Sequence, residues 1–381
     1  MALAPVRPIY LSTAPSPGHH FPAGGGDPAR LGENRSTLGA LPISWFRWHE
    51  IANQREPSLM CDDTTEDENE RYLAKIGRRE FSVGAGAVAA ALVTGCGGPA
   101  PGRPPAAAAP PGPEPAPTPK PPATEPKSEA AATTDLELAQ RKVTITTPDG
   151  KAEGFFVTPK DGKHPGVIVW PDVAGLREAF EKMATGLARD GYAVLVVNPY
   201  YRSSALPILK DFAEWRTEEG KAKIAPMREA LTPEAIAKDG AAFVKWLDEQ
   251  PEVETARKLA TTGYCMGGPF TFRTAAAAPK RVGVIGSFHG GGLVTKEPSS
   301  PHKLFAKMRA AALICIAHND DEREPDAKTT LKDAAAAAKL PVEIEVYPAQ
   351  HGWCAIDSPV YDKAQAERAH GRLLALLQEH L

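Results

Sequence analysis

The sequence predicts an α/β fold in which a mostly parallel, twisted sheet carries helices on both faces. Short apolar stretches alternate with longer stretches whose apolar residues recur at helical spacing, a pattern typical of strands joined by crossover helices. The short stretches are almost continuously hydrophobic, as expected for strands buried on both faces. The pattern extends over residues 134–381, so we expect one domain there, preceded by a disordered N-terminal third.

The elements follow one another in a regular order. Alternating residues at 141–147, the turn at 148–150 and a partner strand at 151–157 predict an opening β-hairpin. Further strands are predicted at 166–170, 193–197, 258–262, 281–288, 311–317 and 342–347. Helices are predicted at 176–190, 232–247, 266–278, 325–339 and 362–380. Residues 200–232 lack a regular period, so we expect irregular structure there.

Composition excludes several classes of protein. The 381-residue chain has a net charge of −3, which provides no basic face for nucleic acid and no polybasic patch for a membrane surface. Its five cysteines form no Cys-x-x-Cys pair and no zinc-like spacing with histidine. We therefore expect no metal, no cofactor and no disulfide framework.

The first 76 residues show no sustained hydrophobic period. We expect them to be disordered, or to be upstream sequence included by a misassigned start codon, with Met60 as an alternative start. The acidic run at residues 61–70 is expected to be solvated.

Residues 77–96 are interpreted as an export signal. Arg78 and Arg79 precede a short apolar stretch, residues 83–93, which resembles a twin-arginine signal and is too short for a stable spanning helix. The stretch ends in small residues before Cys96, which resembles the lipobox of bacterial lipoproteins, where the cysteine becomes the lipidated first residue. The alternative is an ordinary short anchor, or a signal cut without lipidation.

Residues 97–133 are rich in proline and alanine and favour extended polyproline II. We interpret this segment as a semi-rigid linker between the lipid and the domain at 134–381. The expected location is the bacterial cell envelope, with the protein anchored to the membrane through its lipid and facing the periplasm or the exterior.

The sequence around Cys265 indicates a nucleophile. Residues 263–268 read Gly-Tyr-Cys-Met-Gly-Gly and lie between a predicted strand and a predicted helix, which is the nucleophile-elbow pattern. Glycines allow the tight turn, and the positive end of the helix dipole stabilises a thiolate. The alternative is a buried structural cysteine beside a glycine-rich turn.

An acid and a histidine follow the nucleophile at two later strand ends. Asp320 comes just after the strand at 311–317, and His351 just after the strand at 342–347. The order nucleophile, acid, histidine is that of α/β-hydrolases. In this interpretation His351 takes the thiol proton, and Asp320 orients and stabilises the imidazole. Asp321 remains an alternative acid.

Three motifs together resemble the dienelactone hydrolase family, whose members are carboxymethylenebutenolidase-like. They are residues 263–268, the His-Gly-Trp at 351–353 and the Pro-Tyr-Tyr-Arg at 199–202. The resemblance covers about residues 140–381 and implies an α/β-hydrolase that cleaves a small ester, lactone or thioester through an acyl-enzyme. It also implies that Asp172 is an acid that gates the thiol. The implied oxyanion hole consists of the backbone N–H groups of Val173 and Met266.

The substrate pocket is expected to include Tyr201, Arg202, His289 and Trp353. Family members bind a substrate carboxylate with arginines, one of them shortly after the catalytic histidine, but residues 353–357 contain none. Arg202 or Arg228 could substitute, and a structural role for His289 is the alternative.

The leading expectation is a monomeric hydrolase. One alternative is a non-catalytic surface lipoprotein that uses the fold as a small-molecule binding module. A serine-type peptidase relative is disfavoured because the elbow holds cysteine. We do not expect the disulfide that Cys354 could form with Cys265 outside the cytoplasm.

Overall fold

The computed structural model describes residues 64–75 and 136–381, which belong to one unit, Glu56–Leu381. The predicted export signal at 77–96, Cys96 within it and the linker at 97–133 lie outside the described residues. Within the two described segments, no helix has the length and apolar character needed to span a membrane.

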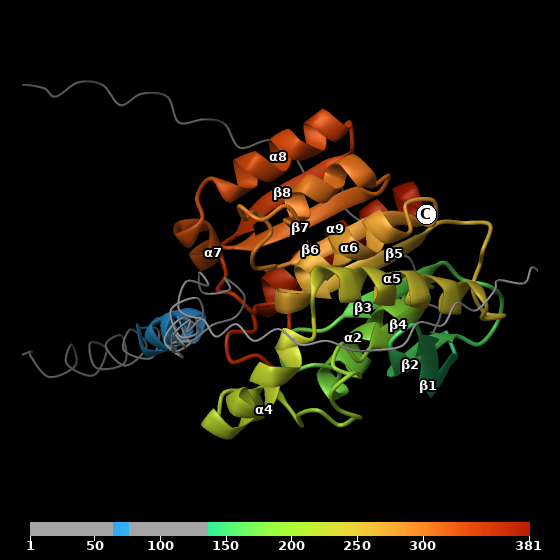
Figure 1. Cartoon of the computed structure of the whole chain (residues 1–381), viewed down its shortest axis with the longest axis horizontal. Coiled ribbons are helices and arrows are strands. Elements are labelled where there is room, and N and C mark those ends of the chain that lie inside the picture. Colours follow the sequence, from blue (N-terminus) through green and yellow to red (C-terminus); the bar gives the residue numbers. More distant parts are fainter. Residues whose placement is uncertain (1–63, 76–135) are drawn as a thin grey trace, which may run out of the picture. The chain divides into compact units, whose positions relative to one another are not determined.

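The domain is built on one eight-stranded sheet with the order β1-β2-β4-β3-β5-β6-β7-β8 (Figure 1). Strands β1, β2 and β4 pair antiparallel, whereas all pairs from β4 to β8 are parallel. The strands are β1 (Leu138–Thr147), β2 (Gly150–Pro159), β3 (Gly166–Trp170), β4 (Ala193–Val197), β5 (Leu259–Tyr264), β6 (Val282–Phe288), β7 (Ala311–Ala317) and β8 (Val342–Tyr347). The predicted parallel sheet with an opening hairpin is confirmed.

Helices cover both faces of the sheet. On one face, α5 (Pro233–Asp248), α6 (Gly268–Ala277) and α8 (Ala327–Ala338) bury apolar side chains such as Phe243 and Leu331. On the other face, α2 (Glu178–Arg189) and α9 (Lys363–His380) do so with Phe180 and Leu373. Each fully buried side chain of this size stabilises the fold by about 1.5–3 kcal/mol. The central strands β3 and β4 are buried throughout, which explains their continuous hydrophobicity.

The stretch at residues 200–232 is more regular than expected. It contains α3 (Phe212–Trp215) and α4 (Glu218–Glu229), and the Thr217 side chain caps α4 by accepting a hydrogen bond from the Gly220 N–H at 3.0 Å. Pro226 lies inside α4, and a proline normally argues against a helix because it removes a backbone hydrogen bond. The sequence therefore did not indicate this helix. Burial of Ile224 and Met227 against the domain stabilises the helix nonetheless.

The acidic run was expected to be solvated, but residues 64–75 form a helix in which Thr65, Glu66 and Asn69 are buried. Its acidic side chains pair with cationic side chains of the hydrolase domain, as described below. The remaining described helices are short: the 3₁₀ segments η3 (Cys265–Gly267) and η4 (Pro301–Lys307), and α7 (His318–Arg323).

Candidate active site

Cys265 lies at a sharp turn between β5 and α6. Its φ of 50° is in the left-handed region, which is strained for a residue with a side chain. The flanking glycines make this turn possible because a β-carbon on Gly263 would lie 2.0 Å from the Gly267 carbonyl oxygen. One on Gly267 would lie 2.4 Å from the Trp170 carbonyl oxygen. The turn therefore has the backbone geometry of a nucleophile elbow.

His351 and Asp320 come from two neighbouring strand ends and are in contact. His351 Nδ1 lies 2.8 Å from Asp320 Oδ2 and 3.0 Å from Oδ1. The two loops are joined by the His351 N–H, which donates to the Asn319 side-chain oxygen at 2.8 Å. Asp321, the alternative acid, instead accepts hydrogen bonds from Lys328 Nζ at 2.5 and 2.8 Å. The structure thus pairs the histidine with Asp320.

The sulfur of Cys265 is disulfide-bonded. Cys315 and Cys354 are both free, so neither is its partner. This agrees with the expectation that Cys354 does not bond to Cys265. Because only a thiolate is a nucleophile, Cys265 must be reduced before it can attack a substrate.

Val173 and Met266, expected to form the oxyanion hole, are held together by Tyr200. The Tyr200 hydroxyl donates to the Val173 carbonyl at 2.8 Å and lies 3.3 Å from the Met266 sulfur. Burial raises the pKa of Tyr200 well above its ordinary value, so the hydroxyl stays a donor, while the nearby charge of Arg228 opposes this rise. The contact ties the loop after β3 to the elbow after β5.

The carboxylate of Asp172 is engaged in a buried ion pair with Arg177. Arg177 donates to both of its carboxylate oxygens, at 2.7 and 2.9 Å, and the Ala174 N–H donates to Oδ1 at 3.0 Å. Arg177 also binds Asp357 at 2.7 Å. Burial alone would lower the pKa of Arg177, but the two carboxylates raise it above its ordinary value. The gating role implied by the resemblance would require this buried ion pair to open.

Tyr201 and Arg202, expected to line the substrate pocket, are engaged in a polar cluster with Asp239 and Asp149. Arg202 binds both oxygens of buried Asp239 at 2.7 Å and Asp149 at 2.8 Å. The Tyr201 hydroxyl donates to Asp239 at 2.7 Å and contacts Thr147. Through these contacts, the loop after β4 that carries Tyr201 and Arg202 joins the β1–β2 turn to α5. Arg202 neutralises the buried charge of Asp239 at this junction.

His289 and Trp353 pack beside His351. The His289 ring centroid lies 5.0 Å from that of His351 and 5.1 Å from that of Trp353. Burial, and secondarily the charge of His351, lowers the pKa of His289 well below its ordinary value, so the ring is neutral. His289 also has a left-handed φ of 41°, and it follows Phe288, which is paired in register with Tyr264. His289 and Cys265 therefore occupy equivalent positions on adjacent strands.

Two further residues, Asn319 and Asn69, contribute to the site without a distinguishing sequence signal. Asn319 binds the backbone of His351, but its position beside two aspartates carries no distinguishing signal. The 64–75 helix contacts the same loop, since the Asn69 side-chain amide donates to the His351 carbonyl at 3.1 Å. The clustering of acidic residues in that segment was the only available signal.

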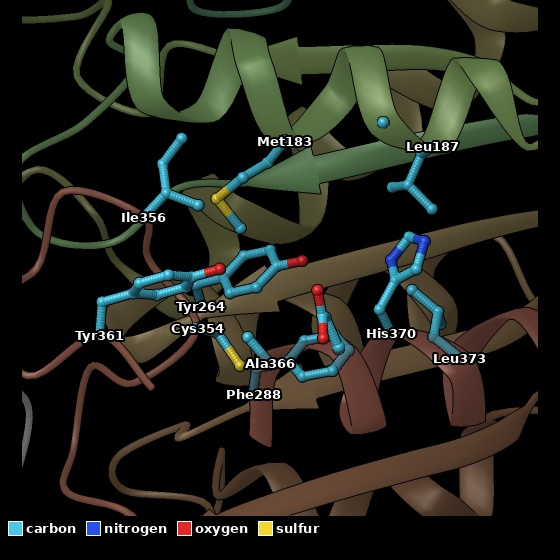
Figure 2. A pocket seen from close by; sticks show the side chains of 12 residues that line it. Met183, Leu187, Tyr264, Phe288, Cys354, Ile356, Tyr361, Ala366, His370 and Leu373 are labelled. Atoms are coloured by element: carbon cyan, nitrogen blue, oxygen red, sulfur yellow. The ribbon is translucent and has the colours of Figure 1, made fainter. Parts of the chain in front are cut away.

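A cavity of about 270 Å³ lies behind the catalytic edge, between α2 and α9 (Figure 2). Tyr264, Phe288 and Cys354 line it, each preceding or following a residue of the site in sequence. None of Cys265, Asp320 and His351 lines it. Burial raises the pKa of the Cys354 thiol well above its ordinary value, so Cys354 offers no reactive thiolate to this cavity.

The elbow, the following acid and histidine, and the eight-stranded sheet define an α/β-hydrolase. The family model of the dienelactone hydrolase family matches residues 152–381, and the chain belongs to this family. It is therefore an ester or lactone hydrolase, as the sequence predicted.

Curated relatives agree with this membership. A Salmonella typhimurium protein named "Putative carboxymethylenebutenolidase" is 26% identical over 226 residues, which are 58% of this chain and 80% of the relative. An Escherichia coli K12 protein of the same name is 25% identical over 232 residues, 59% of this chain and 82% of the relative. A Bradyrhizobium protein named "Probable 2-oxo-3-(5-oxofuran-2-ylidene)propanoate lactonase" is 27% identical over 161 residues, 42% of this chain and 60% of the relative.

Solved structures share the fold. A dienelactone hydrolase-type protein from Klebsiella pneumoniae superposes with a TM-score of 0.56 at 22% identity, covering 64% of this chain and all of that one. A dienelactone hydrolase-like promiscuous phosphotriesterase from metagenomic libraries gives a TM-score of 0.53 at 22% identity, covering 64% and 98%.

Proposed function

We propose that the chain hydrolyses small esters, lactones or thioesters with Cys265 as nucleophile, His351 as general base and Asp320 as the acid that orients His351. The observation that carries the proposal is the contact between His351 Nδ1 and Asp320, at strand ends on the same edge of the sheet as the Cys265 elbow. With Nδ1 bound to the carboxylate, Nε2 is the ring atom that exchanges protons with the thiol and with water.

The reaction proceeds through a thioester. His351 takes the proton from the Cys265 thiol, the sulfur attacks the acyl carbon, and the proton is delivered to the departing alkoxide oxygen. Water then gives a proton to His351 and attacks the thioester, which releases the acid and restores the thiol. The N–H groups of Val173 and Met266, on the two loops joined by Tyr200, stabilise the negative oxygen of each tetrahedral intermediate.

Arg202 is committed to Asp239 and Asp149, which argues against a role for it in binding a substrate carboxylate. Arg228 remains a candidate, and its charge acts on Tyr200, the residue that joins the two oxyanion loops. His289 and Trp353, packed beside His351, form the wall of the substrate site.

The experiment uses the full chain under reducing conditions with a panel of aryl esters and lactones. Cys265→Ala should lower kcat/KM by roughly 10³-fold or more, since nucleophile loss leaves only binding and oxyanion stabilisation. The matched control is Cys315→Ala, which removes a buried thiol from mid-strand β7. Equal activity of wild type and Cys265→Ala would exclude the covalent mechanism.

We also propose that the chain is exported through a twin-arginine signal at residues 77–96 and anchored by a lipid on Cys96. Its domain would then face the periplasm or the exterior. The support is the twin arginine, the short apolar stretch and the small residues before Cys96. Cys96→Ser should move the protein from the membrane to the soluble fraction of a bacterial expression host. Unchanged membrane association would contradict lipidation.

A second function is favoured by the disulfide at Cys265, because a bonded sulfur cannot attack. In this alternative the domain binds small carbonyl compounds without turnover. Labelling of reduced Cys265 by a thiol reagent, together with no hydrolysis across the panel, would favour it.

A further inference from the structure

The loops around the catalytic histidine present a surface of cationic and amide groups to the 64–75 helix. We propose that this surface, formed by Arg216, Asn319, Arg323 and the His351 carbonyl, is a binding site for an acidic helix. Its occupant is residues 64–75 of the same chain, and occupation closes the active site. The closing effect rests on the proposed function, whereas the binding does not.

Arg216 provides the main electrostatic contact. Its Nε atom lies 2.8 Å from Glu66 Oε2 and its Nη2 atom 2.7 Å from Glu70 Oε1. Glu66 and Glu70 are four residues apart and so lie on the same side of the helix. Glu66 is only 8% exposed, so this is a partly desolvated ion pair, in which removal of one partner is costly.

Asn319 and Asn69 connect the helix to the catalytic loop. The Asn319 amide donates to Glu68 at 2.8 Å, while its carbonyl accepts from the His351 N–H at 2.8 Å. Asn69, 3% exposed, donates to the His351 carbonyl at 3.1 Å. Asn69 of the helix thus binds the His351 backbone directly, and Glu68 of the helix is linked to it through Asn319.

Arg323 is shared between the helix and the catalytic acid. It donates to the Thr65 hydroxyl at 2.8 Å and to Asp320 at 2.5 Å. A helix of 12 residues is marginal by itself in water, so its order depends on these contacts. Docking and the arrangement of Asp320 and His351 are therefore coupled.

The position of the 64–75 helix in the chain suggests when it separates from the hydrolase domain. Residues 64–75 precede the predicted signal at 77–96, so cleavage before Cys96 would separate the helix from the hydrolase domain. The helix would then occupy its binding surface in the uncut chain and be absent from it after export. We infer that the precursor is held inactive until it is processed.

The test is a charge-swap series on the reduced full chain. Each charge swap also carries Glu70→Gln, which removes the second acidic partner of Arg216. Glu66→Arg then places like charges together and should release the helix, and so should Arg216→Glu, whereas the double variant should restore docking. The matched control is Asp67→Arg on the exposed side of the same helix. Hydrogen exchange of residues 64–75 measures docking. We expect protection in wild type, Asp67→Arg and the double variant only.

Ester hydrolysis by the same proteins measures closure. Release of the helix should raise kcat/KM by about 5- to 150-fold, the usual range for coupling between sites. Unchanged protection in both single variants, or no recovery in the double variant, would overturn the docking site. If the hydrogen-exchange protection of residues 64–75 changes as expected but all the proteins have the same kcat/KM, docking does not close the active site, and that part of the proposal is overturned. If no variant hydrolyses any substrate while protection changes as expected, the proposed function fails and the docking site stands.

Discussion

Asp172 and Arg177 form a buried ion pair, with side chains only 2% and 1% exposed and oxygen-to-nitrogen distances of 2.7 and 2.9 Å. The pair fixes the loop after β3, which contains Val173, and Asp357 extends it toward the segment after His351. Removing one partner of a buried pair leaves an uncompensated charge.

Arg177→Ala is therefore expected to lower the free energy of unfolding by about 3–5 kcal/mol. The matched control is Arg368→Ala, which removes an exposed ion pair with Glu345 and should cost less than about 1 kcal/mol. Urea unfolding of both variants checks this. Equal losses would show that Asp172 and Arg177 do not stabilise the fold as a buried pair.

Adjacent aspartates should differ sharply in their effect on catalysis. Asp320→Asn should lower kcat roughly 10²- to 10⁴-fold, because Asp320 holds His351 in the productive tautomer. Asp321→Asn removes only the contact with Lys328 and should change kcat little. Steady-state kinetics on the reduced enzyme measures both. Comparable losses in the two variants would contradict the assignment of the acid.

The buried imidazole of His289 should make the fold sensitive to acid. Its folded-state pKa lies well below the ordinary value because of burial and of neighbouring His351, so the unfolded chain binds a proton that the folded chain does not. Stability should fall as pH drops below about 6.5, by at most about 1.4 kcal/mol per pH unit from this group. Urea unfolding from about pH 7 to 5 should show a weaker pH dependence in His289→Phe.

The control for this experiment is His318→Phe, because the His318 side chain is about half exposed. It should retain the wild-type slope. An identical slope in His289→Phe would mean that another group titrates.

Thiol labelling should distinguish Cys265 from Cys315 and Cys354, the free cysteines among the described residues. Burial raises the pKa of Cys315 to about 12 and that of Cys354 well above its ordinary value, so near pH 8 only on the order of 10⁻⁴ of Cys315 is thiolate. After reduction, iodoacetamide should modify Cys265, while Cys315 and Cys354 react only in denaturant. Peptide mass mapping checks this. Fast labelling of Cys315 in the folded protein would contradict its burial.

Features that depend on local sequence could be predicted. Continuous hydrophobicity identified β3 and β4, since strands buried on both faces have no polar positions. The glycines at 263 and 267 identified the elbow because no β-carbon fits there. The alternation of strands and helices then placed Asp320 and His351 at one edge of the sheet.

Features that depend on distant partners could not be predicted. Asp320 and Asp321 are adjacent, and nothing in the sequence distinguishes them. Consecutive residues of a helix are about 100° apart, so α7 directs Asp320 to His351 and Asp321 to Lys328. Arg202 and Tyr201 looked like pocket residues until α5 brought Asp239 beside them.

By itself, the sequence determined the fold class and the elbow at Cys265, because hydrophobic period and glycine sterics act over a few residues. Only the tertiary structure decided that Asp320 is the carboxylate in contact with His351, that Asp172 pairs with Arg177, and that an acidic helix contacts the loop of His351. Ion pairs and desolvation depend on which groups meet in space, and chain order does not specify that.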